Sequence, residues 1–161
     1  QISYTASSPD SSVSPFLRCN DTTTARLLIN SDGDVQNHDN SYGSTSDERI
    51  KSNIVDANSQ WDDIKALKIR NYEKKDDIEL YGAGKKVQIG VIAQELETAG
   101  MTGLTKDGEP DASDIKHGVP SDGKVKVVKY SVLYMKAIKA LQESMSRIET
   151  LEAEVTALKG E

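Results

Sequence analysis

The most regular alternation of apolar and polar positions lies in the C-terminal stretch. Between residues 131 and 159, apolar side chains recur every three or four residues over four heptads. Position a holds Tyr134, Leu141, Ile148 and Val155, and position d holds Ala137, Ser144, Leu151 and Leu158. This spacing predicts one long helix in a parallel coiled coil whose core is formed by Leu141, Ile148, Leu151, Val155 and Leu158.

The flanking heptad positions bear on how many chains this helix joins. Ile138 and Met145 at position e widen the apolar stripe, as a helix with more than one neighbour requires. Arg147 at g faces Glu152 at e of the next heptad in parallel chains. Ile or Val at a with Leu at d favours a dimer, whereas Ser144 and the apolar e positions blur that rule. A helix that packs only on its own domain is the alternative.

Upstream, short apolar runs alternate with turn residues, which predicts an α+β body. The expected strands are residues 16–19, 25–29, 69–72, 87–92 and 125–128. A short helix is predicted over 59–67 with Ser59 as N-cap, and a second begins at Ala93 and ends at Gly100. Asp32-Gly33-Asp34 predicts a hairpin turn. The remaining segments are expected to be a Ser/Thr/Pro-rich linker (1–15), a polar stretch without periodicity (35–45), a hairpin arm (74–86) and a long loop (106–122).

Composition narrows the classes of partner. The chain has 161 residues and a formal charge of −6 with acids and bases interspersed, so nucleic acid is not an expected partner. No apolar run approaches the roughly 20 residues that span a bilayer, and no membrane partner is expected. Cys19 is the only cysteine, which excludes an internal disulfide and a cysteine metal cluster. No metal and no cofactor is predicted. Because Gln1 is not a start methionine, we expect the chain to be a fragment of a longer protein.

A motif near the middle of the chain carries a family resemblance. Residues 46–54 read S-D-E-R-I-K-S-N-I, which resembles the signature S-D-x-R-[LI]-K-x-x-I of the peptidase S74 family. This family comprises the intramolecular chaperone domains of endosialidases, phage tail fibres and neck appendages, and myelin regulatory factors carry a related domain. Further features resemble the family in order, namely N-S-Y-G at 40–43, W-D-D-I at 61–64, G-V-I-A-Q-E at 90–95 and V-K-Y-S at 128–131. The resemblance covers about residues 40–161.

The resemblance implies a function that the residues alone do not. Three chains associate through the domain, a β-rich fibre stem folds against it, and the bond before the motif serine is cut. Carried to this chain, the scissile bond is Thr45–Ser46, the nucleophile is Ser46 and its partner is Lys51, which makes the chain an autocatalytic serine endopeptidase that cuts itself once. Residues 1–45 would be the strand-turn-strand end of a bacteriophage tail fibre or tailspike stem. Residues 46–161 would be the released chaperone, with its helix in a parallel trimeric bundle. Assembly would take place in the host cell cytoplasm, and the N-terminal product would enter the virion.

The proposed chemistry sets two physical conditions. A serine hydroxyl needs a base, and lysine can act as one only when neutral. From a reference pKa near 10.4, holding a lysine neutral at pH 7 costs about 4.6 kcal/mol. Burial at an interface around Ile50 and Ile54 could lower the lysine pKa enough to offset this cost. On a helix Ser46 and Lys51 would lie about 140° apart, and on a strand they would point to opposite faces. The backbone must therefore bend between them, or Lys51 must come from another subunit.

Four other residues are weighed as supporting groups. Asp47 could orient the site and Arg49 could polarise the Thr45 carbonyl, but each is equally expected in a local turn or a surface ion pair. His38 and His117 are candidate bases because histidine is the commonest one, yet both are expected to be solvated loop residues.

Three rival functions remain. The first is a structural module that trimerises a fibre tip and never cuts. The second is a segment like that of myelin regulatory factors, which the acidic charge and the Ser/Thr-rich start disfavour. The third is a glycan hydrolase, which a single Trp disfavours.

Overall fold

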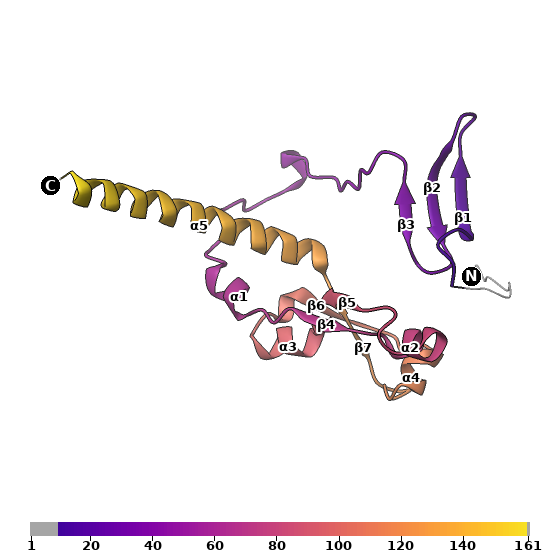
Figure 1. Ribbon diagram of the computed structural model, residues 1–161. Coiled ribbons are helices and arrows are strands. Elements are labelled where there is room, and N and C mark those ends of the chain that lie inside the picture. Colours follow the sequence, from indigo (N-terminus) through magenta and orange to yellow (C-terminus); the bar gives the residue numbers. More distant parts are fainter. Residues whose placement is uncertain (1–9, 161) are drawn as a thin grey trace. The chain divides into compact units, whose positions relative to one another are not determined.

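The structure is a computed structural model that describes residues 10–160 (Figure 1). Part of the predicted linker, residues 1–9, lies outside the described residues. The chain divides into two units, residues 1–54 and 55–161, which are described separately. Together they hold short strands, short helices and one long C-terminal helix, which confirms the mixed α/β character.

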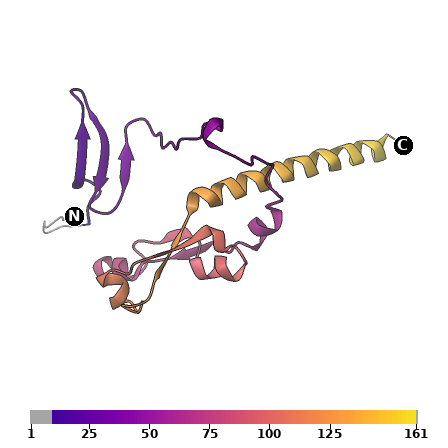
Figure 2. The ribbon, with the colours of Figure 1, turned by 180° about the vertical axis from the view of Figure 1, so that it is seen from behind.

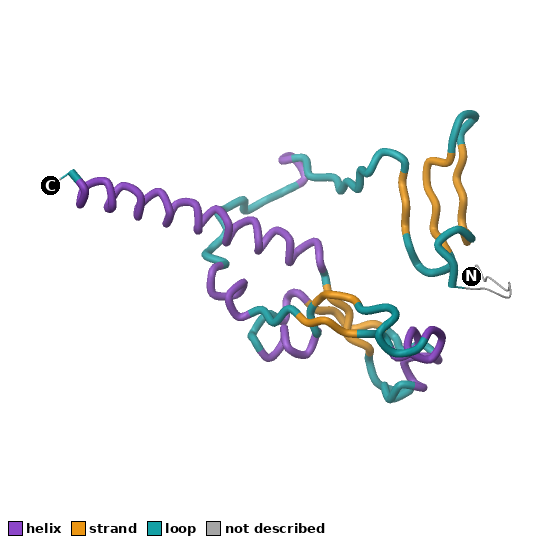
Figure 3. Tube along the Cα trace, in the orientation of Figure 1, coloured by secondary structure: helices purple, strands orange, loops and turns teal. Residues whose placement is uncertain are grey.

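The first unit contains a three-stranded antiparallel sheet (Figure 3). Its strands run in sequence order and are β1 (Pro15–Asn20), β2 (Ala25–Asn30) and β3 (Val35–Asn37). The first two confirm the predicted strands. The predicted hairpin turn is also confirmed: Gly33 has φ 92° and donates its N–H to the Asn30 carbonyl, and β2 and β3 pair on either side. Strand β3 was not predicted, because one valine in three residues gives no alternation to detect.

The second unit contains two small antiparallel sheets, each with a short helix in the connection between its strands (Figures 1 and 2). Strand β4 pairs with β5 around α2, and β6 pairs with β7 around α4. The sheet elements are β4 (Arg70–Tyr72), α2 (Lys75–Tyr81), β5 (Gln88–Gly90), β6 (Thr105–Gly108), α4 (Ala112–Lys116) and β7 (Val125–Val128). The others are α1 (Trp61–Ala66), α3 (Ala93–Thr98), the 3-10 helix η2 (Thr102–Leu104) and α5 (Tyr130–Lys159). The strands predicted at 69–72, 87–92 and 125–128 are confirmed, the first two with shorter bounds.

The predicted hairpin arm at 74–86 is wrong, because most of it forms helix α2. Asp76 and Asp77 lie in the first turn of this helix, where their negative charges interact favourably with the positive end of the helix dipole and stabilise the helix. Gly82 ends it in a positive-φ conformation, φ 87°. The charged surface of this short helix left too few apolar positions for a helical period to be recognised.

The predicted loop at 106–122 is also partly wrong, because it contains most of β6 and all of α4. The Asp111 side chain accepts the Ser113 and Asp114 N–H groups, and the Asp114 carboxylate accepts the Asp111 N–H. This reciprocal pair is a capping box with Asp at both positions. The helix is therefore specified by its cap rather than by an apolar face.

The N-cap predicted for α1 is wrong by one residue. Gln60 is the N-cap, and it makes no side-chain capping bond. Ser59 instead donates its hydroxyl to the Glu143 carboxylate on α5 at 2.8 Å, and the Gln60 N–H donates to the same carboxylate at 3.1 Å. The Ser59 Oγ also accepts the Trp61 N–H at 3.4 Å, so a long local contact accompanies the long-range one.

The core of the second unit is small. It consists of Val91, Leu96, Met101, Leu104 and Leu133, with Ile64, Leu67 and Val128 packed against it. Helix α3 turns into this core at Gly100, φ 83°, where the Met101 N–H donates to the Leu96 carbonyl. The end of α3 at Gly100 confirms the prediction. The core contacts α5 through the first turn of that helix.

Helix α5 confirms the predicted long helix, and its 30 residues span about 45 Å. Its first half faces the body: Leu133 and Ala140 are buried, and Lys136 forms an ion pair with Asp63 on α1 at 2.5 Å. The predicted coiled-coil residues lie exposed in the single chain, at 60% for Leu141, 54% for Ile148, 58% for Leu151, 45% for Val155 and 73% for Leu158. The trimeric bundle stays a prediction. Among residues 10–160, no helix combines the length and the apolar character needed to cross a bilayer.

Candidate active site

Ser46 and Lys51 lie in contact within one chain. The Lys51 Nζ donates a hydrogen bond to the Ser46 Oγ at 2.5 Å. A bend in the backbone, one of the two predicted ways of bringing them together, therefore occurs without a second subunit. The contact places a potential base within proton-transfer distance of a potential nucleophile.

The bend is one turn of 3-10 helix, η1 (Glu48–Ile50). Asp47 precedes it in extended conformation and caps it by accepting the Arg49 N–H at 2.9 Å. Lys51 follows it in extended conformation, and its N–H donates to the Glu48 carbonyl at 3.0 Å. Because extended residues flank a single 3-10 turn, the backbone changes direction between Ser46 and Lys51. The two side chains can therefore meet, which they would not do on a straight helix or strand.

Asp47 and Arg49 form a local ion pair beside the site. The Arg49 Nε and one terminal nitrogen donate to the two Asp47 carboxylate oxygens at 2.9 and 2.7 Å. These bonds hold the pKa of the Asp47 carboxyl below its usual range and raise the pKa of Arg49. The pair matches the turn and surface ion-pair interpretation, and it fixes the turn that precedes Lys51. Roles of these residues in catalysis stay predictions.

The surroundings of the pair are open in the single chain. Ser46 and Lys51 are both exposed. Ile50 and Ile54, around which burial was expected, have 65% and 64% of their surface exposed. Ile50 and Ile54 therefore do not bury the Lys51 amine by themselves, and burial of this amine would need additional apolar surface.

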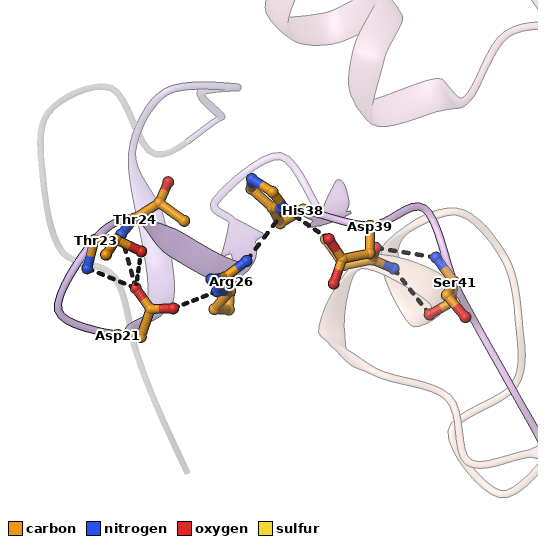
Figure 4. A network of polar contacts seen from close by, with 8 residues as sticks. Asp21, Thr23, Thr24, Arg26, His38, Asp39 and Ser41 are labelled. Atoms are coloured by element: carbon orange, nitrogen blue, oxygen red, sulfur yellow. Dashed lines mark hydrogen bonds and ion pairs between the residues drawn. The ribbon is translucent and has the colours of Figure 1, made fainter.

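The two histidines have different environments. His38 is half-exposed and contacts Asp39 at 2.6 Å and Arg26 at 3.3 Å (Figure 4). Figure 4 shows that this network continues through Arg26 to Asp21, and Ser46 is not one of its members. His38 thus agrees with the expected surface histidine.

For His117, the expectation of a solvated loop residue is wrong. Its side chain is only 18% exposed, and its Nε2 lies 2.8 Å from an Asp76 carboxylate oxygen. It follows α4 directly as the C-cap residue, which was hidden while that helix was unrecognised. The sequence signal for this contact is a histidine at the end of one helix and acidic residues in another. It was missed because neither α2 nor α4 was predicted.

The site is thus a serine and a lysine in contact across one tight turn, followed in the sequence by a mixed α/β unit with a long C-terminal helix. Residues 46–106 match the Peptidase_S74 family, described as chaperone of endosialidase. The match begins at Ser46 and includes the segments 61–64 and 90–95, which confirms the family resemblance over these residues. No curated protein matches the chain.

Proposed function

We propose that this chain is a self-cleaving intramolecular chaperone that trimerises and folds a phage tail fibre or tailspike and is released by cutting its own Thr45–Ser46 bond. The observation that supports this most directly is the 2.5 Å contact between Lys51 Nζ and Ser46 Oγ, at the first residue of the family match. The fibre stem is the folding client, and the second and third chains of the trimer are the partners.

The reaction proceeds in two steps. The Ser46 Oγ attacks the Thr45 carbonyl carbon while Lys51 Nζ takes the hydroxyl proton, and the C–N bond then breaks as the Ser46 nitrogen is protonated. The resulting ester joins Thr45 to the Ser46 oxygen. Water hydrolyses this ester, leaving the Thr45 carboxylate and restoring the Ser46 hydroxyl. Lysine serves as the acceptor only in its neutral form.

Assembly provides a switch for this step. In the observed contact the lysine donates and the hydroxyl accepts, so a proton must leave before their roles reverse. Removing an ammonium group from water favours its neutral form. Ile50 and Ile54, which neighbour Lys51 in the sequence, have about two thirds of their surface exposed, which suits a site that becomes dry only when other chains cover it. Cleavage would then follow trimerisation.

Two features of the second unit support assembly through α5. The exposed stripe of Leu141, Ile148, Leu151, Val155 and Leu158 has no covering in the single chain. Beside it, an apolar groove of about 330 Å³ lies between α1 and α5 and includes Trp61, Ile64 and Leu141 among its lining residues. Arg147 stacks on the Trp61 ring at 4.0 Å and fixes one side of this region. A helix from another chain would bury the stripe and fill the groove.

The chaperone role follows from this order of events. Three helices in register bring three stems together, which lowers the entropic cost of slow, non-local β pairing. Cleavage then removes the template, so the product cannot unfold by reversing its route of formation, and its stability becomes kinetic. In this proposal the reaction takes place in the host cytoplasm, and the product before Ser46 enters the virion.

The test is the Ser46→Ala variant beside the parent chain and a Ser44→Ala control. The parent and the control are expected to give two bands after denaturation, whereas Ser46→Ala stays as one band at 17.6 kDa and still forms trimers. An uncut parent trimer would support the rival module that assembles a fibre tip without cutting. Cleavage of Ser46→Ala at the normal rate would remove Ser46 as the nucleophile.

A further inference from the structure

Helices α2 and α4, which each lie between the strands of a different sheet, are joined by a polar cluster. Asp76 and Glu79 belong to α2, and His117 caps α4. The His117 Nε2 lies 2.8 Å from Asp76 Oδ1 and 4.0 Å from Glu79 Oε1. All three ligand-type atoms lie within 4.8 Å of one another. The two helices thus present one nitrogen and two oxygens to a common point.

The outer oxygens of both carboxylates are already held by α4. The Ser113 hydroxyl donates to Asp76 Oδ2, and Lys116 Nζ donates to Glu79 Oε2. Each carboxylate therefore turns its other oxygen toward His117. A supporting bond to the outer atom of a ligand group is the usual way in which proteins orient metal ligands.

We propose that Asp76, Glu79 and His117 bind a divalent transition-metal ion, with Zn²⁺ as the best fit. One imidazole and two carboxylates form an accepted ligand set for this ion, at metal–ligand distances of about 2.0–2.2 Å. Ligand atoms on a tetrahedral ion lie roughly 3.4 Å apart, between the observed 2.8 and 4.0 Å separations. Binding would move the His117 Nε2 away from Asp76 Oδ1 and toward Glu79 Oε1. The fourth position would be open to water or to a group from another chain.

The charges near the cluster affect how tightly it would bind a metal ion. Asp76 and Glu79 supply two negative charges, while Lys116 remains on the outer oxygen of Glu79 and partly offsets them. Lys75 also points to this region, donating to the His117 carbonyl at 3.1 Å. The expected role is structural: the ion would replace the direct contacts of His117 with Asp76 and Glu79 by metal–ligand bonds that join the two helices. This role is independent of the Ser46 chemistry.

The experiment is Zn²⁺ titration by calorimetry of the tag-free full chain carrying Ser46→Ala, which keeps it intact, and Cys19→Ser. The second change removes the exposed thiol, which could bind the ion by itself. We expect saturation at one Zn²⁺ per chain. His117→Gln, which can still bond to Asp76, should weaken binding about tenfold or more, whereas His38→Gln should leave it unchanged within about twofold.

Two further measurements keep the test decisive. Circular dichroism establishes that His117→Gln retains the helical signal of the parent. Co²⁺ in place of Zn²⁺ should give a visible absorption band that His117→Gln abolishes and His38→Gln keeps. Absence of saturable binding, or equal binding by His117→Gln, would overturn the proposal and leave the cluster as an ion-paired link. Neither result bears on whether Thr45–Ser46 is cut.

Discussion

Replacing both Ile148 and Leu151 with serine tests whether the exposed stripe of α5 assembles the chains. These side chains keep 54% and 58% of their surface exposed, so the variant is expected to cost the single chain little. Full burial of an Ile or Leu contributes about 1.5–3 kcal/mol, and the exposed half therefore contributes about 1 kcal/mol each on assembly. Two positions in three chains give about 6 kcal/mol per trimer, which is roughly a 10⁴-fold loss in the association equilibrium.

The matched control replaces the adjacent Glu149 and Thr150 with serine. Both residues are exposed and occupy heptad positions outside the apolar stripe, so the control introduces two serines into the same turn without removing apolar surface. Both variants are made in the Ser46→Ala background, which keeps the chains uncut. Sedimentation at micromolar concentration then distinguishes the states, because the single chain has a mass of 17.6 kDa and a trimer three times that. The control should sediment as a trimer and the Ile148→Ser/Leu151→Ser chain as a monomer.

The same substitutions in chains that retain Ser46 link assembly to cleavage. If a dry interface around Lys51 activates the reaction, the monomeric variant stays uncut while the control is processed at the parental rate. A variant that remains trimeric would refute the assignment of the stripe as the interface. A variant that becomes monomeric yet processes normally would refute the switch, because the site would then need no second chain.

Three other perturbations test separate parts of the molecule. Lys51→Met removes the amine but keeps an apolar stem, and denaturing gels should show an uncut chain that still trimerises; Lys51→Arg, which stays charged, should not restore cleavage. Gly90→Ala should destabilise the second unit by about 1–3 kcal/mol in denaturant unfolding, because the added carbon would lie 2.8 Å from the Tyr130 hydroxyl; unchanged stability would contradict the close packing. The Arg70 bonds hold the pKa of Glu95 below its ordinary 4.5, so this pair stabilises the fold above that pH and the effect is lost as pH falls through the lowered value. Melting temperatures from neutral to acidic pH should fall less in Arg70→Met than in the parent, and an identical fall would show that the pair contributes nothing.

The sequence determined the elements whose signals are local or periodic. The long helix follows from the heptad spacing of Leu141 to Leu158, and the end of α3 follows from Gly100, which alone among neighbouring residues adopts φ 83° without steric cost. The family motif at 46–54 likewise lies at the start of the segment 46–106 that matches the family. Each of these depends on the order of nearby residues, so no knowledge of distant contacts was needed.

The tertiary structure decided what distant or strongly bent segments do. It showed that η1 brings Lys51 to Ser46 in one chain, a choice that five-residue spacing left open. It also brought His117 onto Asp76 across 41 residues, turning an apparent loop histidine into part of a polar cluster. Contacts of this kind between side chains depend on backbone turns and on the packing of separate elements. Short polar helices are also hard to predict from sequence, because they lack a periodic pattern of apolar residues.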